Sequence, residues 1–335
     1  MDLSEVKRIT NERRLAFGPE DRLMSMAQIK YPWAIDVYDR MEANTWFPKS
    51  IAMNDDRVCY RGGQLTEREK SAYDKALAFV SNADGFQFTN LVQNIGQHIT
   101  APEVSLALAR QAAEEGVHVR SYQLMIDAVS DNPGALYMLY QSDRKLAEKN
   151  AMMQGQSQVL RDEPTPANFA RAIVANVILE GVYFYSAFLT FYVLARNGKM
   201  LASADMIKYI NRDEGGTHLD LFTKMHHTFM QENRELYDQR FAEDARQLFR
   251  EAADLEIGWG QHIIQGGFLG MTDEIVDGFV KDRCNRCSKA LGLGEVFPGV
   301  KNPVPWFDQF AEPNSGRSNF FESKPTDYDA SGFEW

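Results

Sequence analysis

The chain has 335 residues, of which 44% are hydrophobic and 12% are aromatic, and its formal net charge is −11. This composition indicates a folded protein with an extensive core rather than a disordered chain. Its 47 acidic residues outnumber the 36 basic ones, which argues against a general binder of the nucleic-acid backbone.

The first sixty residues look irregular, because prolines interrupt them at Pro19, Pro32 and Pro48. They lack the apolar core of a signal peptide. The most apolar stretch of the chain, roughly residues 172–194, contains Asn176 and Glu180 and therefore predicts a buried helix rather than a membrane span. We expect a cytoplasmic protein that does not cross a membrane.

Helical patterning starts at QLTEREKSAYDKALAFV, where Thr66 and Glu69 form a capping-box pattern. The sequence contains no alternating strand run of convincing length, no glycine-rich phosphate loop and no GxSxG motif. The pattern predicts an all-α fold. Further helices are expected at about 84–99, 102–129, 133–149, 166–197, 202–231, 233–265 and 272–291.

The three cysteines are Cys59, Cys284 and Cys287, and the last two form a CxxC motif. Such a motif can be half of a zinc site or a redox pair. Here it lies inside a predicted helix without a second pair of ligands, so we expect helix surface residues. Few cysteines also fit a reducing compartment.

Three helical segments carry acids and histidines in unusual places. Glu115, His118 and Tyr122 are spaced to share one helix face, although a solvated polar stripe would look the same. Glu180 lies in the apolar run VANVILEGVYFYSAFLTFYVL, where an unpaired carboxylate is costly. It therefore needs a partner, which could be a metal, a buried cation or a proton shared across helices.

A third segment, INRDEGGTHLDLF, carries Glu214 and His218 four residues apart. Dimetal helical bundles use two such Glu/His helices and one carboxylate from each of two others. Asp84 is the best candidate for the remaining carboxylate, although Asp-Gly also marks turns and helix starts. Oxygen donors with two imidazoles suit iron or manganese. The predicted ligands are Asp84, Glu115, His118, Glu180, Glu214 and His218.

On these residues the chain resembles the small, radical-generating subunit of class I ribonucleotide reductase, from Trp46 to the C-terminus. The likeness rests on Asp84-Gly85, on Glu115 and His118 followed by Ser121-Tyr122, and on the buried Glu180. RDE at residues 212–214, NPVPW at 302–306 and the tail extend it.

The resemblance implies an all-α, ferritin-like helical bundle with extra helices and a flexible C-terminal tail, forming a homodimer. Two metal ions per subunit, iron or manganese, would activate an oxygen species and generate the oxidant. A separate large subunit would use that oxidant to reduce ribonucleoside diphosphates. The implied layout is an irregular segment at 1–60, the dimetal domain at 61–300 and a docking tail at 301–335.

The resemblance also assigns roles to residues outside the ligand set. Tyr122 matches the radical tyrosine, and Asp213 matches the acid that accepts a hydrogen bond from His118. Trp46 and Tyr328 match the residues that pass the oxidant to the large subunit. Ordinary core packing and a frayed tail are the alternatives for these residues. The apolar pocket around the radical is matched by Phe184, Phe188 and Ile210.

Three other interpretations compete with this one. A related dimetal oxidase would act on a small or fatty substrate, and an iron-storage protein would need neither the relay residues nor the aromatic tail. A metal-free helical scaffold would leave Glu180 unexplained. The ligand types accept iron and manganese equally, and the oxidant could be stored on Tyr122 or on the metals.

One spacing departs from the family pattern. The second Glu/His pair normally has two residues between its ligands, whereas three separate Glu214 from His218. A π-bulge can absorb one extra residue, and Gly215-Gly216 makes such a distortion sterically easy. We predict that His218 remains the ligand and that the backbone here is not regular α-helix. His226 and His227 lie too far along the helix to replace it.

Overall fold

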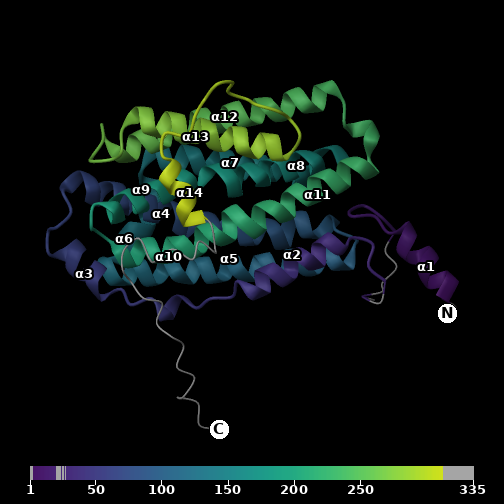
Figure 1. Cartoon of the computed structure of the whole chain (residues 1–335), viewed down its shortest axis with the longest axis horizontal. Helices are drawn as coiled ribbons and strands as arrows, with labels where there is room; N and C mark the ends of the chain where they lie inside the picture. The colour runs from purple at the N-terminus through teal and green to yellow at the C-terminus, as the bar shows by residue number, and fades with distance from the viewer. Residues whose placement is uncertain (1–2, 20–23, 25, 27, 312–335) are drawn as a thin grey trace, which may run out of the picture.

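The computed structural model describes residues 3–19, 24, 26 and 28–311, and Figure 1 shows them as a bundle of long helices. Within these residues the chain forms helices and only two isolated β-bridges, which confirms the all-α prediction. The α-helices that precede the π-turn Leu179–Tyr183 are α1 (Leu3–Glu12), α2 (Pro32–Ala43), α3 (Asn54–Arg61), α4 (Glu67–Asn90), α5 (Pro102–Val129), α6 (Pro133–Ser142), α7 (Arg144–Asp162) and α8 (Pro166–Ile178). Those after it are α9 (Tyr185–Arg196), α10 (Leu201–Arg212), α11 (Leu219–Glu232), α12 (Gln239–Ile264), α13 (Asp273–Ala290) and α14 (Asp308–Ala311).

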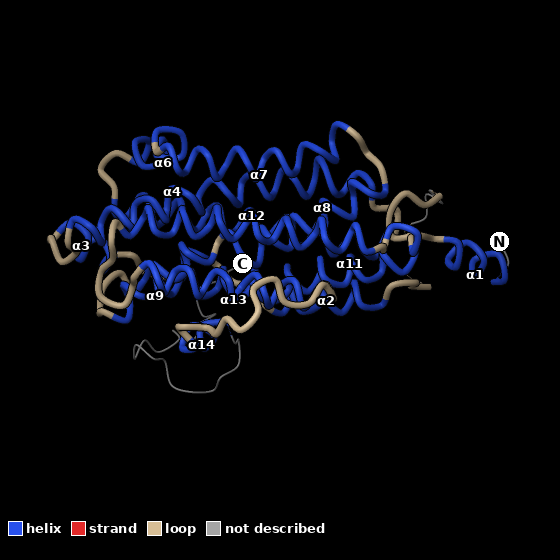
Figure 2. The backbone as a smooth tube through the Cα atoms, turned by 90° about the horizontal axis from the view of Figure 1, so that it is seen from above, coloured by secondary structure: helices blue, strands red, loops and turns tan. Residues whose placement is uncertain are grey.

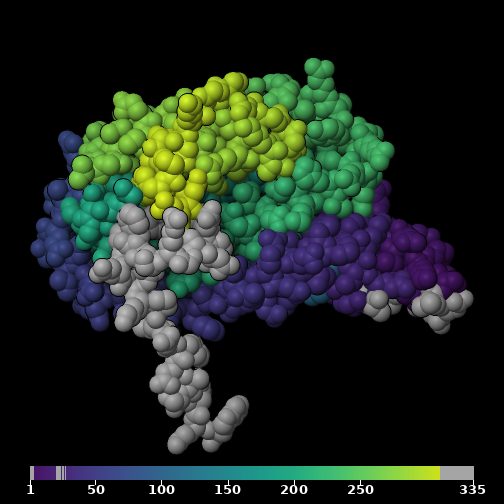
Figure 3. Space-filling view, viewed as in Figure 1, coloured from purple at the N-terminus to yellow at the C-terminus, as the bar shows by residue number. Residues whose placement is uncertain are grey.

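The long helices run side by side along the molecule (Figure 2). α4 packs along α5, α8 packs on α11, and α9 contacts both α4 and α10. α12 and α13 pack together and cover the turn between α8 and α9. The segment after α13 crosses the outside of the bundle and brings α14 against α10 (Figure 3).

The apolar stretch that includes α8 and α9 is the one described segment, Pro166–Arg196, that is long and hydrophobic enough to span a membrane. In the structure 94% of its most apolar window is buried inside the protein. A helix that is hydrophobic all round is buried in the core of a large bundle. The prediction of a buried core helix is confirmed.

The N-terminal region is more helical than predicted. α1, α2 and α3 all lie in the first sixty-one residues, so the expected irregular segment is wrong over these ranges. Pro32 occupies the first turn of α2, where a missing N–H has no cost and the fixed φ favours a helix. The apolar face of α2 is buried against α5, and its members are Ala34, Val37 and Met41.

Two predicted boundaries also differ from the structure. No break precedes Asp84, which lies inside the continuous helix α4, so Asp84-Gly85 is neither a turn nor a helix start. The capping box at Thr66 and Glu69 begins that helix as predicted. The segment predicted as one helix at 133–149 is divided at Asp143, whose carboxylate accepts the Leu146 N–H at 3.1 Å and starts α7.

The CxxC motif lies in α13 as predicted, but its cysteines are not surface residues. Cys284 and Cys287 are both fully buried, because this face of α13 packs on α12 and on the turn after α8. The close approach of that turn requires Gly181, where an added Cβ would lie 2.3 Å from the Cys287 sulfur. Burial raises the pKa of both thiols, so the pair is inert packing rather than a reactive site.

Two of the long helices are interrupted by a π-helical turn. One turn, Leu179–Tyr183, joins α8 to α9, and the other, Asp213–His218, joins α10 to α11. The second confirms that the backbone around Gly215-Gly216 is not regular α-helix. A further π-turn, Leu91–Ile95, ends α4, and short 3₁₀ turns occur at Pro48–Ser50, Gly96–His98, Arg234–Leu236 and Pro305–Phe307.

Candidate metal centre

The six predicted ligands meet in the interior of the bundle. Asp84 comes from α4, Glu115 and His118 from α5, Glu180 from the Leu179–Tyr183 turn, and the last pair from the Asp213–His218 turn. All six side chains are fully buried. Their donor atoms form two groups, within each of which the atoms lie within 4.8 Å of one another. The His118 group is Asp84, Glu115, His118 and Glu214, and the His218 group is Glu115, Glu180, Glu214 and His218.

The same nitrogen of each imidazole faces the carboxylates. Nδ1 of His118 lies 2.9 Å from Glu214 Oε1, 3.4 Å from Glu115 Oε2 and 3.5 Å from the Asp84 carboxylate. Nδ1 of His218 lies 3.4 Å from oxygens of both Glu115 and Glu214 and 3.8 Å from Glu180. His218 therefore points toward Glu214 despite the extra residue. Glu115 and Glu214 each belong to both groups.

The donor atoms fit a pair of bound cations. Buried polar atoms normally have a hydrogen-bond partner, and leaving one without a partner is costly. Both carboxylate oxygens of Asp84 and of Glu214 have none, nor has Nδ1 of either histidine. One oxygen each of Glu115 and Glu180 is in the same state. Four carboxylates and two neutral imidazoles match the charge of two divalent ions, so the residues fit a dimetal site.

The electrostatics of the metal-free cluster reflect crowded acids in a dry interior. Burial, with the charge of Glu214 nearby, raises the pKa of Asp84 to about 6 and that of Glu115 to about 7. Burial alone would lower the pKa of His118, but Asp213 and the surrounding carboxyl groups raise it well above its usual value. Without cations, the cluster therefore holds protons between its acids and imidazoles.

The other nitrogen of each histidine contacts a carboxylate outside the groups. Nε2 of His118 lies 3.3 Å from Asp213 Oδ2, the contact that the family resemblance predicts for this acid. Nε2 of His218 lies 2.9 Å from Glu114 Oε2, and Arg110 holds Glu114 at 3.2 Å. Such contacts fix each ring so that its Nδ1 faces the carboxylates of its group. Sequence reasoning missed Glu114, although it directly precedes Glu115.

Amide side chains surround Glu180, and sequence reasoning missed all of them. Gln111 Nε2 donates to Glu180 Oε1 at 2.8 Å, Asn176 Nδ2 donates to the same oxygen at 3.4 Å, and Gln87 also donates to it. These bonds occupy one oxygen and leave Oε2 directed at the His218 group. Helical spacing was the available signal, because Gln111 precedes Glu115 by four residues and Asn176 precedes Glu180 by four.

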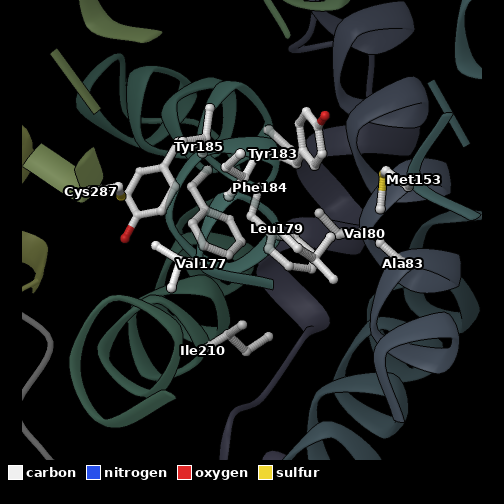
Figure 4. Packing of buried hydrophobic residues seen from close by; sticks show 14 of the residues in the cluster. Val80, Ala83, Met153, Val177, Leu179, Tyr183, Phe184, Tyr185, Ile210 and Cys287 are labelled. Atoms are coloured by element: carbon white, nitrogen blue, oxygen red, sulfur yellow. The ribbon is translucent and has the colours of Figure 1, made fainter. Parts of the chain in front are cut away.

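Tyr122 lies on the same helix as Glu115 and His118 and is fully buried. Burial, followed by the charge of Asp84, raises the pKa of its phenol well above the usual value, so the hydroxyl keeps its proton. The predicted pocket residues Phe184, Phe188 and Ile210 are fully buried in the same core. Figure 4 shows Phe184 and Ile210 in this interior, and the Phe184 and Phe188 rings stack with centroids 5.8 Å apart.

A second polar contact leads from His118 toward the surface. Trp46 Nε1 donates to Asp213 Oδ2 at 2.8 Å, the same oxygen that faces His118. Arg212 Nη2 holds the other oxygen of Asp213 at 2.9 Å. The Trp46 ring is half-buried and stacks on Tyr209 with centroids 5.0 Å apart. Tyr328, predicted to continue this path, lies outside the described residues.

Comparisons with known proteins agree with this geometry. The family model for the ribonucleotide reductase small chain matches residues 23–303. Ribonucleoside-diphosphate reductase subunit beta of Treponema pallidum is 34% identical over 323 residues, which cover 95% of this chain and 91% of that protein.

Two solved structures extend the likeness to the fold. The ribonucleotide reductase R2 subunit from Clostridium botulinum has 37% identity and a TM-score of 0.86, covering 90% of this chain and 94% of its own. A putative class I ribonucleotide reductase from Bacillus halodurans has 30% identity and a TM-score of 0.80, covering 83% of this chain and 99% of its own. The chain belongs to the ribonucleotide reductase small-chain family.

Proposed function

We propose that this chain is the small subunit of class I ribonucleoside-diphosphate reductase, which generates and stores the oxidant used by a separate catalytic subunit. The observation that carries the proposal is the convergence of partnerless carboxylate oxygens and imidazole nitrogens in the bundle interior. Family membership favours this function over the dimetal oxidase and iron-storage alternatives.

The ligands would be Asp84 and His118 on one metal and Glu180 and His218 on the other, with Glu115 and Glu214 shared between them. When bound, two iron or manganese ions would supply the oxidising power. The carboxylates hold the ions and balance their charge. Asp213 and Glu114 keep the imidazoles oriented, and the amides around Glu180 hold one of its oxygens still.

Tyr122 is the residue on which the oxidant would be stored as a radical. Its phenol is protonated at neutral pH, so its oxidation must release the Oη proton. The Asp84 carboxylate is close enough to influence that proton. The apolar residues Phe184, Phe188 and Ile210 exclude water and reductants, without which a phenoxyl radical is quickly lost. Storage on the metals is the alternative outcome.

Charge would leave the site through the contacts of His118. The bonds from His118 to Asp213 and from Trp46 to the same carboxylate oxygen give a continuous path from the cluster to a half-buried indole. The large subunit would be reached through the C-terminal tail, with Tyr328 as the last relay and residues 332–335 as the docking peptide. We propose a homodimer in the cytoplasm that binds no nucleic acid.

Metal analysis and electron paramagnetic resonance test the proposal. We expect two metal ions per chain after aerobic reconstitution with iron, manganese or both, and turnover of ribonucleoside diphosphates with the large subunit. Tyr122→Phe keeps both ions and loses any tyrosyl signal. Activity retained in Tyr122→Phe would place the oxidant on the metals, and a protein without metals or turnover would refute the proposed function.

The tail has a separate test. A chain truncated after Phe321 should bind two metal ions and give the same radical signal as the full chain, because the cluster lies within α4 to α11. Its activity with the large subunit should be abolished. A fully active truncated chain would contradict the roles of Tyr328 and the terminal peptide.

A further inference from the structure

The regular helix that carries Glu180 is interrupted shortly after that residue. The π-turn Leu179–Tyr183 is followed by Phe184, and α9 begins at Tyr185. The last carbonyl oxygens of one helical segment and the first N–H groups of the next have no partner inside their own segment. Since this junction is fully buried, such groups must be satisfied by neighbouring side chains.

A buried ion pair binds the backbone on both sides of the break. Lys149 Nζ, from α7, donates to the carbonyl oxygen of Tyr183 at 2.7 Å. Glu256 Oε1, from α12, accepts the N–H of Ser186 at 3.2 Å. The two charged groups contact each other at 2.5 Å, and both side chains are fully buried. The cation thus faces the carbonyl end of one segment, and the anion faces the amide end of the next.

A second cation binds the turn from another side. Arg283, from α13, donates through Nε to the Gly181 carbonyl oxygen at 3.0 Å. Its guanidinium lies 3.5 Å from the centre of the Tyr185 ring. The turn that carries Glu180 is therefore held at Gly181 and Tyr183, and the start of α9 is held at Ser186, by charged groups from three different helices.

Burying these charged side chains costs free energy. Moving an ion pair into a protein interior is costly, and well-packed apolar residues of similar volume are often as stable. Part of the cost for Lys149 is offset by the Phe79 ring, whose centre lies 3.4 Å from Nζ. The proposed transfer of charge through Asp213 and Trp46 uses neither Lys149 nor Glu256. Their role lies instead in the hydrogen bonds that they make to the backbone on both sides of the junction.

We propose that Lys149 and Glu256, assisted by Arg283, are positioning residues that hold the Leu179–Tyr183 turn and so fix Glu180 in the His218 group. Glu180 belongs only to that group, whereas Glu115 and Glu214 belong to both. Loss of the pair should therefore weaken one metal position and spare the other. This metal-binding consequence rests on the proposed function, but the hold on the backbone does not.

The double variant Lys149→Met/Glu256→Gln tests the proposal, because it removes both charges with little change of volume. In the metal-free protein, hydrogen exchange of the amides in residues 181–186 should become at least about tenfold faster. In Mn²⁺ titrations followed by electron paramagnetic resonance, one ion should bind about tenfold more weakly while the other keeps its affinity. Lys149→Arg, which keeps the charge, should restore part of both properties.

The pair Lys199 and Glu69 provides a matched control. Its atoms are 2.7 Å apart, and it lies at the start of α4 rather than beside Glu180. Lys199→Met/Glu69→Gln should leave exchange at residues 181–186 and both Mn²⁺ affinities unchanged. If the first double variant does not fold, the same measurements on Glu256→Gln decide the question, with faster exchange expected at Ser186.

Unchanged exchange at residues 181–186 in the folded variant would overturn the proposal. Equal weakening of both ions would also overturn it, because that result indicates a general loss of structure. If the parent protein binds no Mn²⁺, the proposed function fails, yet the exchange measurement still tests the role of the pair. Normal Mn²⁺ binding with unchanged exchange would refute only the positioning role.

Discussion

The His118 group and the His218 group have nearly the same donors but very different surroundings. The His118 group is next to Tyr122 and, through Asp213, to the Trp46 indole. The His218 group is bounded by the amides that hold Glu180 and by the Glu114–Arg110 pair. Oxidisable aromatic rings thus lie beside the His118 group, whereas redox-inert polar side chains lie beside the His218 group. Under the proposed function, the His118 group would pass charge on, whereas the His218 group would hold its ligands in place.

The largest expected effect concerns the protons that compete with metal ions for the carboxylates of the two groups. In the metal-free protein Asp84 and Glu115 keep their protons up to about pH 6 and pH 7, because burial raises their pKa. In the unfolded chain they lose them near pH 4. The folded state therefore binds more protons between about pH 4 and pH 7, so the stability contributed by these groups falls as pH rises through that window.

Metal binding should reverse that dependence. Divalent ions bind the deprotonated carboxylates, so their apparent affinity should fall about tenfold per pH unit below 7 for each proton displaced. Thermal unfolding with and without Mn²⁺ between pH 5 and pH 7.5 measures both trends. Glu115→Gln serves as the control, since it should flatten the metal-free curve. A parent protein whose metal-free curve matches that of Glu115→Gln would contradict the prediction.

Trp46→Phe should separate the two groups by function. The substitution removes the N–H bond to Asp213 and the oxidisable indole, so activity with the large subunit should fall about a hundredfold. Both metal ions should remain, since Trp46 touches no ligand oxygen. Trp33→Phe is a matched control, because Trp33 is partly buried and packs on Tyr31 away from the site. Equal losses in the two variants would remove Trp46 from the proposed path.

Gln111→Leu should affect the opposite group. Its amide donates to Glu180 at 2.8 Å and to Glu115 at 3.3 Å, so one Mn²⁺ should bind about tenfold more weakly. The exposed residue Gln158 bonds only to Asp162 on the surface, and Gln158→Leu should leave both affinities unchanged. If Gln111→Leu left Mn²⁺ binding intact, the amides would be ordinary core contacts rather than supports for Glu180.

The sequence predicted the two groups better than their surroundings. Helical spacing placed Glu115 with His118, and the ligand pattern of dimetal bundles selected the six residues that the structure brings to one interior, although their metal binding stays a proposal. The amides around Glu180 carried only the weak signal of four-residue spacing, which does not distinguish them because Gln and Asn are common on helices. The Lys149–Glu256 pair was equally hidden, since its partners come from helices far apart in the chain. Local sequence signals gave wrong predictions where tertiary packing determines the structure. Asp84 does not start a helix, and Cys287 is buried rather than on the helix surface.

The spacing of Glu214 and His218 is an exception to these failures, because two adjacent glycines in the sequence correctly indicated a distorted backbone. The structure assigns these glycines different roles within the π-turn Asp213–His218. A Cβ on Gly215 would lie 2.5 Å from the Tyr185 hydroxyl oxygen, whereas a Cβ on Gly216 would meet nothing within 4 Å. Tyr185 is fully buried and ringed by Phe188, Phe279 and Phe307, so it has little room to move.

Gly215→Ala should therefore lower the free energy of unfolding by about 1–3 kcal/mol, the usual range for overpacking a core. Gly216→Ala is the matched control in the same turn and should change stability by less than about 1 kcal/mol, with a gain from reduced backbone freedom in the unfolded chain. Denaturant unfolding of the metal-free proteins measures both. Because Gly215 separates Glu214 from His218, its alanine variant should also weaken Mn²⁺ binding to both groups. An equal loss of stability in the two variants would show that the turn needs flexible backbone at both positions rather than space beside Tyr185, and no loss in either would show that Tyr185 can move aside.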